Sequence, residues 1–339
     1  MVKTLPTIRA ANLLPIVRWM DANGRPTHRS LDNVGLGCWF NLAPEDPIPL
    51  INAISFLRNA SDQEGPDLPC RVVSSASVGE LAYIGRIALG TQSPRESLTR
   101  VARFLPMHSS HEDIVISDIG PDLIVRESWR LKIDERSLHA IHVMLASMVN
   151  QICSFATMTN PSVNKLEIIP HPEHGVEHLR PWFGNGVVES KGPVFSATIS
   201  SDIADRKFRI ISKDRLPMLS KKNIAPLAED KTLAGSIRPV LESLLHGGEP
   251  TIVSISEAMN MSVRTLQRQL AKEGTNFSSE LEIVRCRLAK KMLLEDDTSI
   301  DRVCERLGYS SSPALSRAVR RMTGRPPSEL AKFKRSSVS

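Results

Sequence analysis

One local pattern occurs twice in the last third of the chain, and this repetition constrains the fold more than any other feature. The first copy spans residues 254–270 and the second spans 298–319. In each copy a hydroxyl residue, followed three positions later by an acid, opens a short helical pattern, and a tight turn and a second helical pattern follow. The opening pairs are Ser254 with Glu257 and Thr298 with Asp301. Each copy therefore predicts a helix-turn-helix.

Both copies carry matching signals at the turn and in the second helix. In the first copy, Ser262 is expected to cap the helix and Gly274 to end it. In the second copy, Gly308 is expected to end the leading helix and Ser312 to cap the next, with Pro313 at its first position. Each second helix has an apolar stripe at helical spacing. The stripes are Val263, Leu266 and Leu270, and Leu315, Ala318, Val319 and Met322.

A longer helix is predicted between the two copies. Ser279 and Glu282 form an N-terminal capping pair, and apolar residues then recur on one face. Two recognition helices reach successive major grooves of DNA when they lie about 34 Å apart. We expect the linking helix to hold the two motifs at a separation of this order.

The polar faces of the two second helices carry the candidate DNA-binding residues. The first helix offers long donors and amides that can pair with base edges, whereas the second offers mostly short side chains and arginines suited to phosphate. The candidates are Arg264, Thr265, Gln267 and Arg268 in the first helix and Ser312, Ser316, Arg317 and Arg320 in the second. Alternatively, Arg268 and Arg317 brace acids on neighbouring helices. We expect the two motifs to read double-stranded DNA unequally.

The excess positive charge lies in the same region. From residue 231 onward the chain has 18 Lys and Arg and 12 Asp and Glu, whereas the first 230 residues have 25 of each. A basic module joined to a neutral one indicates a polyanion partner for that module alone. The alternative is a basic surface that serves solubility.

The first 213 residues mix two periodicities. Helices are expected near 13–20, 49–59, 81–89, 93–104 and 137–156, and strands near 114–116, 123–125, 165–169, 186–189 and 194–199. Gly120 and Pro121 between the first two strands are typical of a hairpin. The mixture favours an α+β domain over an all-β barrel.

A histidine-rich stretch between His171 and His178 is the one constellation here that could bind a metal. His174 and His178 would face the same way on a helix, as metal ligands do. Gly175 weakens that helix, however, and no catalytic Glu follows in the metalloprotease order. We therefore expect a solvated helix start, with no metal and no other cofactor.

Several classes of protein are disfavoured. The five cysteines lie far apart without a Cys-x-x-Cys pair, which favours a reducing cytoplasm. The most apolar predicted helix, near 137–156, is interrupted by polar residues and is not expected to span a membrane. Glycine-rich nucleotide loops and a Gly-x-Ser-x-Gly elbow are absent, so we expect no enzyme. An enzyme with a fused DNA-binding tail is the alternative.

About the last hundred residues resemble the tandem helix-turn-helix domain of AraC/XylS-family bacterial transcription regulators. The resemblance rests on motifs that follow in order at the family's spacing. These are Leu266-Gln267-Arg268, Phe277, the helix at 285–294, Leu307-Gly308-Tyr309 and the segment 323–328. One departure is that Leu315 and Val319 stand where the family usually has aromatics.

A weaker resemblance links the preceding region to the arabinose-binding-like, non-cupin effector domain of one subgroup of this family. It rests on Leu81-x-Tyr-Ile-Gly85, Pro170 and Trp182-Phe-Gly184. The resemblance implies a sensor role, but no residue here shows by its chemistry what is sensed. The ligand-binding residues are therefore left unassigned.

Together these features predict three parts. An α+β effector-sensing and dimerisation domain spans 1–213, a linker spans 214–238, and an all-α domain with two helix-turn-helix motifs joined by a linking helix spans 239–339. The family resemblance implies a cytoplasmic bacterial activator that contacts RNA polymerase, responds to a small-molecule effector and forms a homodimer. The alternatives are a repressor of the same family and a ligand-independent architectural DNA-binding protein.

Overall fold

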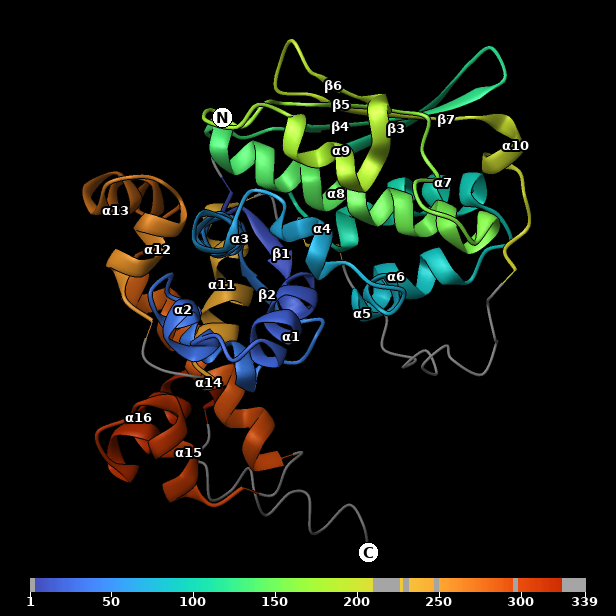
Figure 1. The fold of residues 1–339 in the computed structure, drawn as a ribbon. Coiled ribbons are helices and arrows are strands. Elements are labelled where there is room, and N and C mark those ends of the chain that lie inside the picture. The colour runs from blue at the N-terminus through green and yellow to red at the C-terminus, as the bar shows by residue number, and fades with distance from the viewer. Residues whose placement is uncertain (1–3, 210–225, 228–231, 247–249, 295–297, 325–339) are drawn as a thin grey trace, which may run out of the picture.

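The computed structural model describes residues 4–209, 226–227, 232–246, 250–294 and 298–324 (Figure 1). Helices and two sheets form the N-terminal part, which is coloured from blue to yellow in Figure 1, and helices alone form the orange and red C-terminal part. The predicted combination of an α+β part and an all-α part is therefore confirmed.

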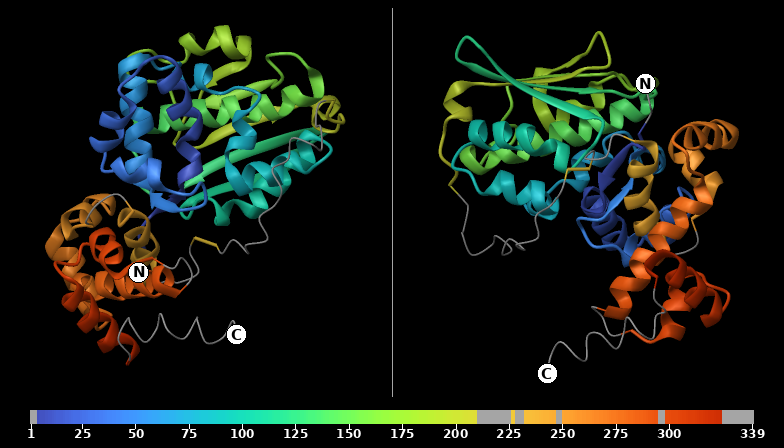
Figure 2. Two further views of the ribbon diagram at one scale, coloured as in Figure 1. Left: turned by 90° about the horizontal axis from the view of Figure 1, so that it is seen from below. Right: turned by 180° about the vertical axis from the view of Figure 1, so that it is seen from behind.

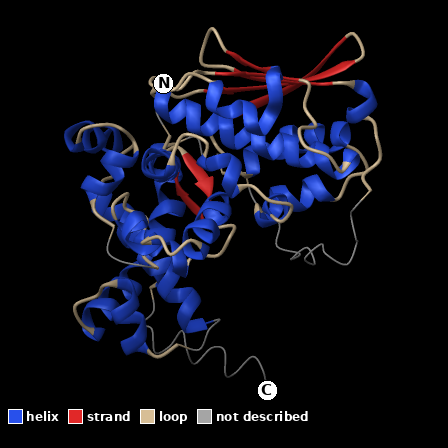
Figure 3. Ribbon diagram, viewed as in Figure 1, coloured by secondary structure: helices blue, strands red, loops and turns tan. Residues whose placement is uncertain are grey.

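A five-stranded sheet lies on one side of the N-terminal part (Figure 3). Its strand order is β3-β4-β7-β5-β6, and all neighbours are antiparallel except β5 and β6, which are parallel. The strands are β3 (Glu112–Ile119), β4 (Asp122–Trp129), β5 (Lys165–Ile168), β6 (Val187–Glu189) and β7 (Phe195–Ile199). Gly120 has a φ of +60° in the β3–β4 hairpin, a left-handed conformation that glycine adopts without a steric penalty. Both this hairpin and the other predicted strands are confirmed.

Helices cover one face of this sheet, and α8 (Glu135–Thr157) runs beneath it (Figure 1). The other N-terminal elements are β1 (Thr7–Arg9), η1 (Ala10–Leu13), α1 (Leu14–Ala22), α2 (Thr27–Asp32), η2 (Gly37–Asn41), β2 (Pro47–Pro49), α3 (Leu50–Glu64), α4 (Leu68–Val72), α5 (Ser77–Glu80), α6 (Ala82–Leu89), α7 (Pro94–Phe104), η3 (Leu105–Met107), η4 (Glu177–Leu179), α9 (Arg180–Phe183), η5 (Gly184–Gly186) and α10 (Ser201–Ala204). All five predicted helices are present.

Helix α8 joins two hydrophobic cores. Its Val143 and Val149 pack in the core beneath the five-stranded sheet, and its Ala140 packs in a second core built around β1, β2, α1 and α3. By length and composition α8 is apolar enough to cross a membrane, but 61% of its most apolar window is buried inside the protein. A buried core helix has this same composition, and α8 packs as one.

The C-terminal part consists of α11 (Leu233–Leu244), α12 (Ile252–Ala258), α13 (Val263–Lys272), α14 (Phe277–Leu294), α15 (Ile300–Leu307) and α16 (Ser312–Thr323). Its core draws on every one of these helices. The pairs α12–α13 and α15–α16 are the two predicted helix-turn-helix motifs, and α14 is the predicted linking helix. Gly274 and Gly308 adopt left-handed conformations at the helix ends, as expected.

Helix α11 begins six residues earlier than the predicted start at Pro239, which lies inside the helix. The Thr232 hydroxyl accepts a hydrogen bond from the Gly235 N–H, and the Glu273 carboxylate accepts from the Leu233 and Ala234 N–H groups at 2.8 and 2.9 Å. These acceptors satisfy donors that the first turn leaves free. The end of the predicted linker is therefore helical, whereas 214–225 and 228–231 lie outside the described residues.

The linking helix α14 begins at Phe277, and Asn276 rather than Ser279 caps it, because Asn276 Oδ1 accepts a hydrogen bond from the Ser279 N–H at 3.0 Å. Within the two motifs, three further predicted N-caps are wrong by one to three positions. Thr251, rather than Ser254, caps α12, and Ser254 is the reciprocal partner in the capping box. Ser299 caps α15 in place of Thr298, and Ser311 caps α16 in place of Ser312. In each case two hydroxyl residues stand near the helix start, and the one whose backbone is extended is the cap. The predicted Ser262 cap of α13 is confirmed.

Candidate functional sites in two helix-turn-helix motifs and an internal cavity

Helix α13 presents most of its candidate residues to solvent. Leu266 and Leu270 are fully buried and anchor the helix on the core. Arg264, Gln267 and Arg268 are exposed on its other side, as the apolar stripe predicted. The fourth candidate, Thr265, is less available to DNA. Its side chain is half-buried, and its hydroxyl lies 2.9 Å from the hydroxyl of the Ser262 cap.

Helix α16 has a less available polar face. The Ser312 hydroxyl donates to Asp301 Oδ1 of α15 at 2.9 Å, and Ser316 is half-buried. Arg317 and Arg320 are exposed. Ser312 and Ser316 of this helix therefore lie partly against their own motif, whereas Arg317 and Arg320 face solvent.

Arg264, Arg268, Arg317 and Arg320 are exposed on the two recognition helices and form no ion pair within the part of the chain that the structure describes. The alternative in which Arg268 and Arg317 brace neighbouring acids therefore gains no support. The arginine that braces a helix is Arg321, which pairs with Glu282 of α14. Figure 1 shows α13 and α16 at opposite ends of the C-terminal part, with α14 between the two motifs.

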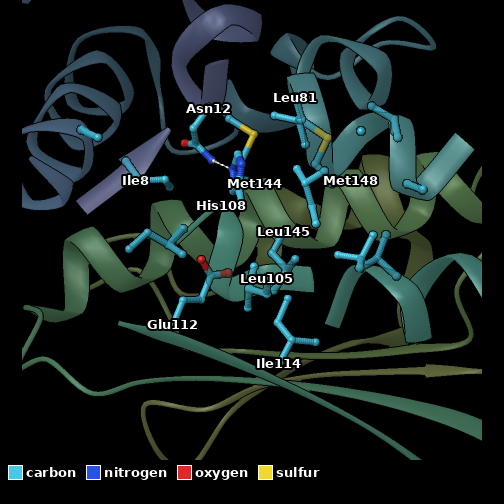
Figure 4. Close-up of a pocket in the computed structure, with 18 of the residues that line it drawn as sticks. Ile8, Asn12, Leu81, Leu105, His108, Glu112, Ile114, Met144, Leu145 and Met148 are labelled. Carbon is cyan, nitrogen blue, oxygen red and sulfur yellow. Dashed lines mark hydrogen bonds between the residues drawn. The ribbon is translucent and has the colours of Figure 1, made fainter. Parts of the chain in front are cut away.

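An internal cavity of about 150 Å³ lies in the N-terminal part, between α8, the β3–β4 hairpin and helices α3, α6 and α7 (Figure 4). Most of its lining is aliphatic or methionine. Prominent lining residues are Leu81, Leu105, Ile114, Met144, Leu145 and Met148. A concave, mostly apolar space with a few polar groups is typical of small-molecule sites.

Three polar side chains line this cavity, and Figure 4 shows them toward one side of it. Asn12 Nδ2 lies 3.4 Å from His108 Nε2. Burial lowers the pKa of His108 to about 3, so its ring is neutral. Burial raises the pKa of Glu112 to about 7, so its carboxyl is protonated in a large fraction of molecules near neutral pH. This end of the cavity can both donate and accept hydrogen bonds.

The segment Leu5–Arg9 connects the cavity with the DNA-binding part. Leu5 is 1% exposed and packs in the C-terminal core, and its N–H donates to Ser236 Oγ of α11 at 2.9 Å. Three residues later Ile8 lines the cavity, and the Arg9 N–H donates to the His108 carbonyl at 3.0 Å. Figure 2 shows α11 beside β1 and β2, and α11 packs directly on β2.

The histidine-rich stretch differs from the predicted helix start. A turn closed by two backbone hydrogen bonds between His171 and Gly175 precedes the short helix η4, so His174 and His178 do not share a helix. The rings of His171, His174 and His178 instead gather with His139 of α8, at centroid distances between 4.9 and 6.4 Å. Burial lowers the pKa of His139 to about 3.

No sequence pattern points to the polar residues of the cavity or to His139. Glu112 opens a strand and His108 precedes it, positions at which polar residues are common. His139 lies in an apolar helix, where it was taken as an interruption of the apolar run. Their proximity comes from packing between elements far apart in the chain, which periodicity does not report.

Comparison with known proteins places residues 255–332 in the family described as "Helix-turn-helix domain". The chain is 25% identical over 281 residues to the uncharacterized HTH-type transcriptional regulator Rv1395 of Mycobacterium tuberculosis, a match that covers 77% of each chain. It is 25% identical to the ornithine utilization regulator of Pseudomonas aeruginosa, over 64% of this chain and 63% of that one. It is 29% identical to the transcriptional activator RhrA of Rhizobium meliloti, over 35% of this chain and 40% of the relative.

Among solved structures, the transcriptional regulator CdpR from Pseudomonas aeruginosa aligns over 95% of this chain and 98% of its own, with a TM-score of 0.40 and 17% identity.

Proposed function

We propose that this chain, whose residues 255–332 match a helix-turn-helix domain found in transcriptional regulators, is a cytoplasmic activator of the AraC/XylS type and that a small, mostly apolar effector controls its DNA binding. The observation that carries this proposal is the internal cavity, which the segment Leu5–Arg9 joins to the DNA-binding core.

The connecting segment supports a route for control. An effector can shift an equilibrium between two states only when it binds one of them better. A ligand that displaces Ile8 or His108 changes the segment that ends in Leu5, and Leu5 is buried among the helices that carry α13. The effector thereby changes how firmly α11 of the DNA-binding part is held against β2.

The open face of the five-stranded sheet supports pairing of two copies. Val115 of β3 and Val188 of β6 lie in one cross-strand row and are 56% and 38% exposed, and Ile119 is 58% exposed. Arg126, Ser196 and Glu167 lie between the two valines in this row, so the face mixes apolar and polar groups, as the contacts of non-obligate dimers do. We propose a homodimer through this face, with RNA polymerase as the further partner of the DNA-bound form.

The first test concerns the effector class. An engineered cavity of about 150 Å³ holds benzene, so a single ring fits the volume. We expect phenol, which adds a hydroxyl for Glu112, to raise the melting temperature of the N-terminal part, and benzoate to have no effect because burying its charge against a mostly apolar lining is costly. A ligand at about one hundred times its Kd stabilises by about 2.7 kcal/mol. Tryptophan fluorescence reports this part alone, since Trp19, Trp39, Trp129 and Trp182 all belong to it.

Two variants of one cavity residue make this test specific. Leu145→Trp fills the space and is expected to abolish the response to phenol, whereas Leu145→Met conserves volume and is expected to keep it. An equal response in both variants would show that phenol binds elsewhere, and the cavity would lose its role in the proposal.

The second test concerns how the two motifs read DNA. We expect Arg264→Ala or Gln267→Ala to relax base preference in one half of the operator, because a bidentate contact discriminates by about 1 to 3 kcal/mol. Arg320→Ala should lower affinity for all sequences alike, as loss of a phosphate contact does. The Ser312 bond to Asp301 supports this asymmetry. Binding to a randomised operator library measures both effects.

Ser316→Ala is the matched control in the second motif. The Ser316 side chain is short and half-buried, so it is not expected to reach a base edge. Base preference lost through Ser316, or lost equally in both halves of the operator, would overturn the assignment. Transcription from the bound promoter, raised or lowered by the protein, separates the activator from a repressor. Regulation that no small molecule alters favours the architectural alternative.

A further inference from the structure

Four histidines and a carboxylate from separate parts of the N-terminal domain meet at one place near the start of α8. Ligand atoms of His171, Glu173 and His174 lie within 4.8 Å of one another. His171 is buried, whereas Glu173 and His174 are exposed, so this group is open to solvent on one side. His178 lies beside it, with ring centroids 6.2 Å from His174 and 6.4 Å from His171.

His139 determines which nitrogen of His178 is free. His139 Nδ1 lies 2.7 Å from the Ile169 carbonyl, which can only accept, so Nδ1 carries the proton and Nε2 the lone pair. His139 Nε2 is 3.1 Å from His178 Nε2, so His178 donates there from Nε2. The lone pair of His178 is therefore on Nδ1. That atom is buried and makes no hydrogen bond to a side chain within the described residues, and a contact of the His178 ring with the His174 backbone is the interaction that a bound ion would replace.

This relay matches the environment of metal-bound histidines. A ligating histidine usually donates its second ring N–H to an acceptor, which fixes its tautomer and orientation. An unpartnered buried ring nitrogen is costly in a native structure, and a bound cation would satisfy it.

Two hydrogen bonds compete with cation binding and limit which ligand atoms of Glu173 and His171 a metal can use. Arg136 donates to Glu173 Oε1 at 2.5 Å, so only the second carboxylate oxygen is free for a metal. The Glu173 N–H donates to His171 Nδ1 at 3.2 Å, and metal binding through that nitrogen would replace this bond. Neither interaction involves His174 or His178 Nδ1.

We propose that His171, Glu173, His174 and His178 bind one divalent transition-metal ion of the zinc class, with His139 as the residue that positions His178. Imidazole nitrogens with one carboxylate oxygen suit Zn²⁺ and similar ions in tetrahedral geometry. The ion would tie the 171–178 segment to α8, which also forms a wall of the internal cavity. The site is separate from that cavity. A protein that binds no metal here could therefore still bind the proposed effector.

The test uses the full chain without a histidine tag, stripped with a chelator and titrated with Co²⁺. We expect the visible absorption of tetrahedral cobalt, saturation at one equivalent, and displacement by Zn²⁺. The melting temperature of the N-terminal part should rise with either ion. A titration with neither absorption nor a shift in melting temperature overturns the proposal.

Three variants locate the site. His174→Ala changes an exposed residue and is expected to lower Co²⁺ affinity by more than about 100-fold, the upper limit for an outer-shell partner. His139→Gln should lower it by about ten- to one hundred-fold. His246→Ala, an exposed histidine of the C-terminal part, should leave it unchanged. Metal-free melting temperatures confirm folding, and a cobalt spectrum that survives in His174→Ala contradicts the assignment.

Discussion

A fragment that begins near residue 231 is expected to bind DNA alone, with an affinity that falls about a thousand- to a hundred-thousand-fold between roughly 50 and 200 mM salt. Such a loss corresponds to six to ten neutralised phosphates. The fragment has 18 basic and 12 acidic residues, and Arg264, Arg268, Arg317 and Arg320 are exposed on its recognition helices. Its core is built almost wholly from its own helices, because Leu5 is the only buried member of that core, among the described residues, that comes from the N-terminal part.

Fluorescence anisotropy with a short duplex measures this salt dependence. The matched variant is Arg317→Gln, which removes one exposed charge and should reduce the slope of log affinity against log salt by about 0.9. The missing Leu5 costs stability, of the order of about 2 to 5 kcal/mol for a buried leucine, so circular dichroism must accompany the assay. A folded fragment whose DNA affinity does not change with salt concentration would contradict the proposed phosphate contacts.

The helices of the DNA-binding part could be predicted because their signals are local. Leu266 and Leu270 repeat at helical spacing and are buried, and Gly308 ends α15 in the left-handed conformation. The exact starts could not be predicted where hydroxyl residues are neighbours. Ser311 and Ser312 are equally good caps by residue type, and only the backbone conformation at Ser311 distinguishes them.

The cavity and the histidine cluster could not be predicted, because no local pattern encodes them. His139 is 30 residues from Ile169, whose carbonyl sets its tautomer, and 39 from His178. Likewise, Asn12 reaches His108 across 96 positions. Such pairs depend on how α8 packs against the sheet and the N-terminal helices. The stretch 171–178 contains residue types that bind metals, but from the sequence it was expected to start a solvated helix without a metal, and nothing in it pointed to His139.

At pH 8, the Glu112→Gln variant is expected to be more stable than the parent protein by about 3 kcal/mol. Burial raises the pKa of Glu112 from 4.5 to about 7, and each unit corresponds to about 1.4 kcal/mol. A carboxyl with a raised pKa in the folded state is tolerated below pH 4.5, where both states are protonated. Its burial destabilises increasingly as pH rises to 7, and the full penalty applies above that.

Chemical denaturation followed by tryptophan fluorescence at pH 4, 6 and 8 measures this difference. The variant and parent should be equally stable at pH 4 and diverge as pH rises. Burial also raises the pKa of Glu127, and the charge of Glu112 raises it further, so the variant should retain a weaker pH dependence that belongs to Glu127. Glu189→Gln, an exposed carboxylate on β6 of the same sheet, is the control and should change stability little at any pH. A Glu112→Gln protein that loses stability at pH 8 would mean that the carboxylate is held by favourable partners in its charged form, and the cavity would then favour a cationic effector over phenol.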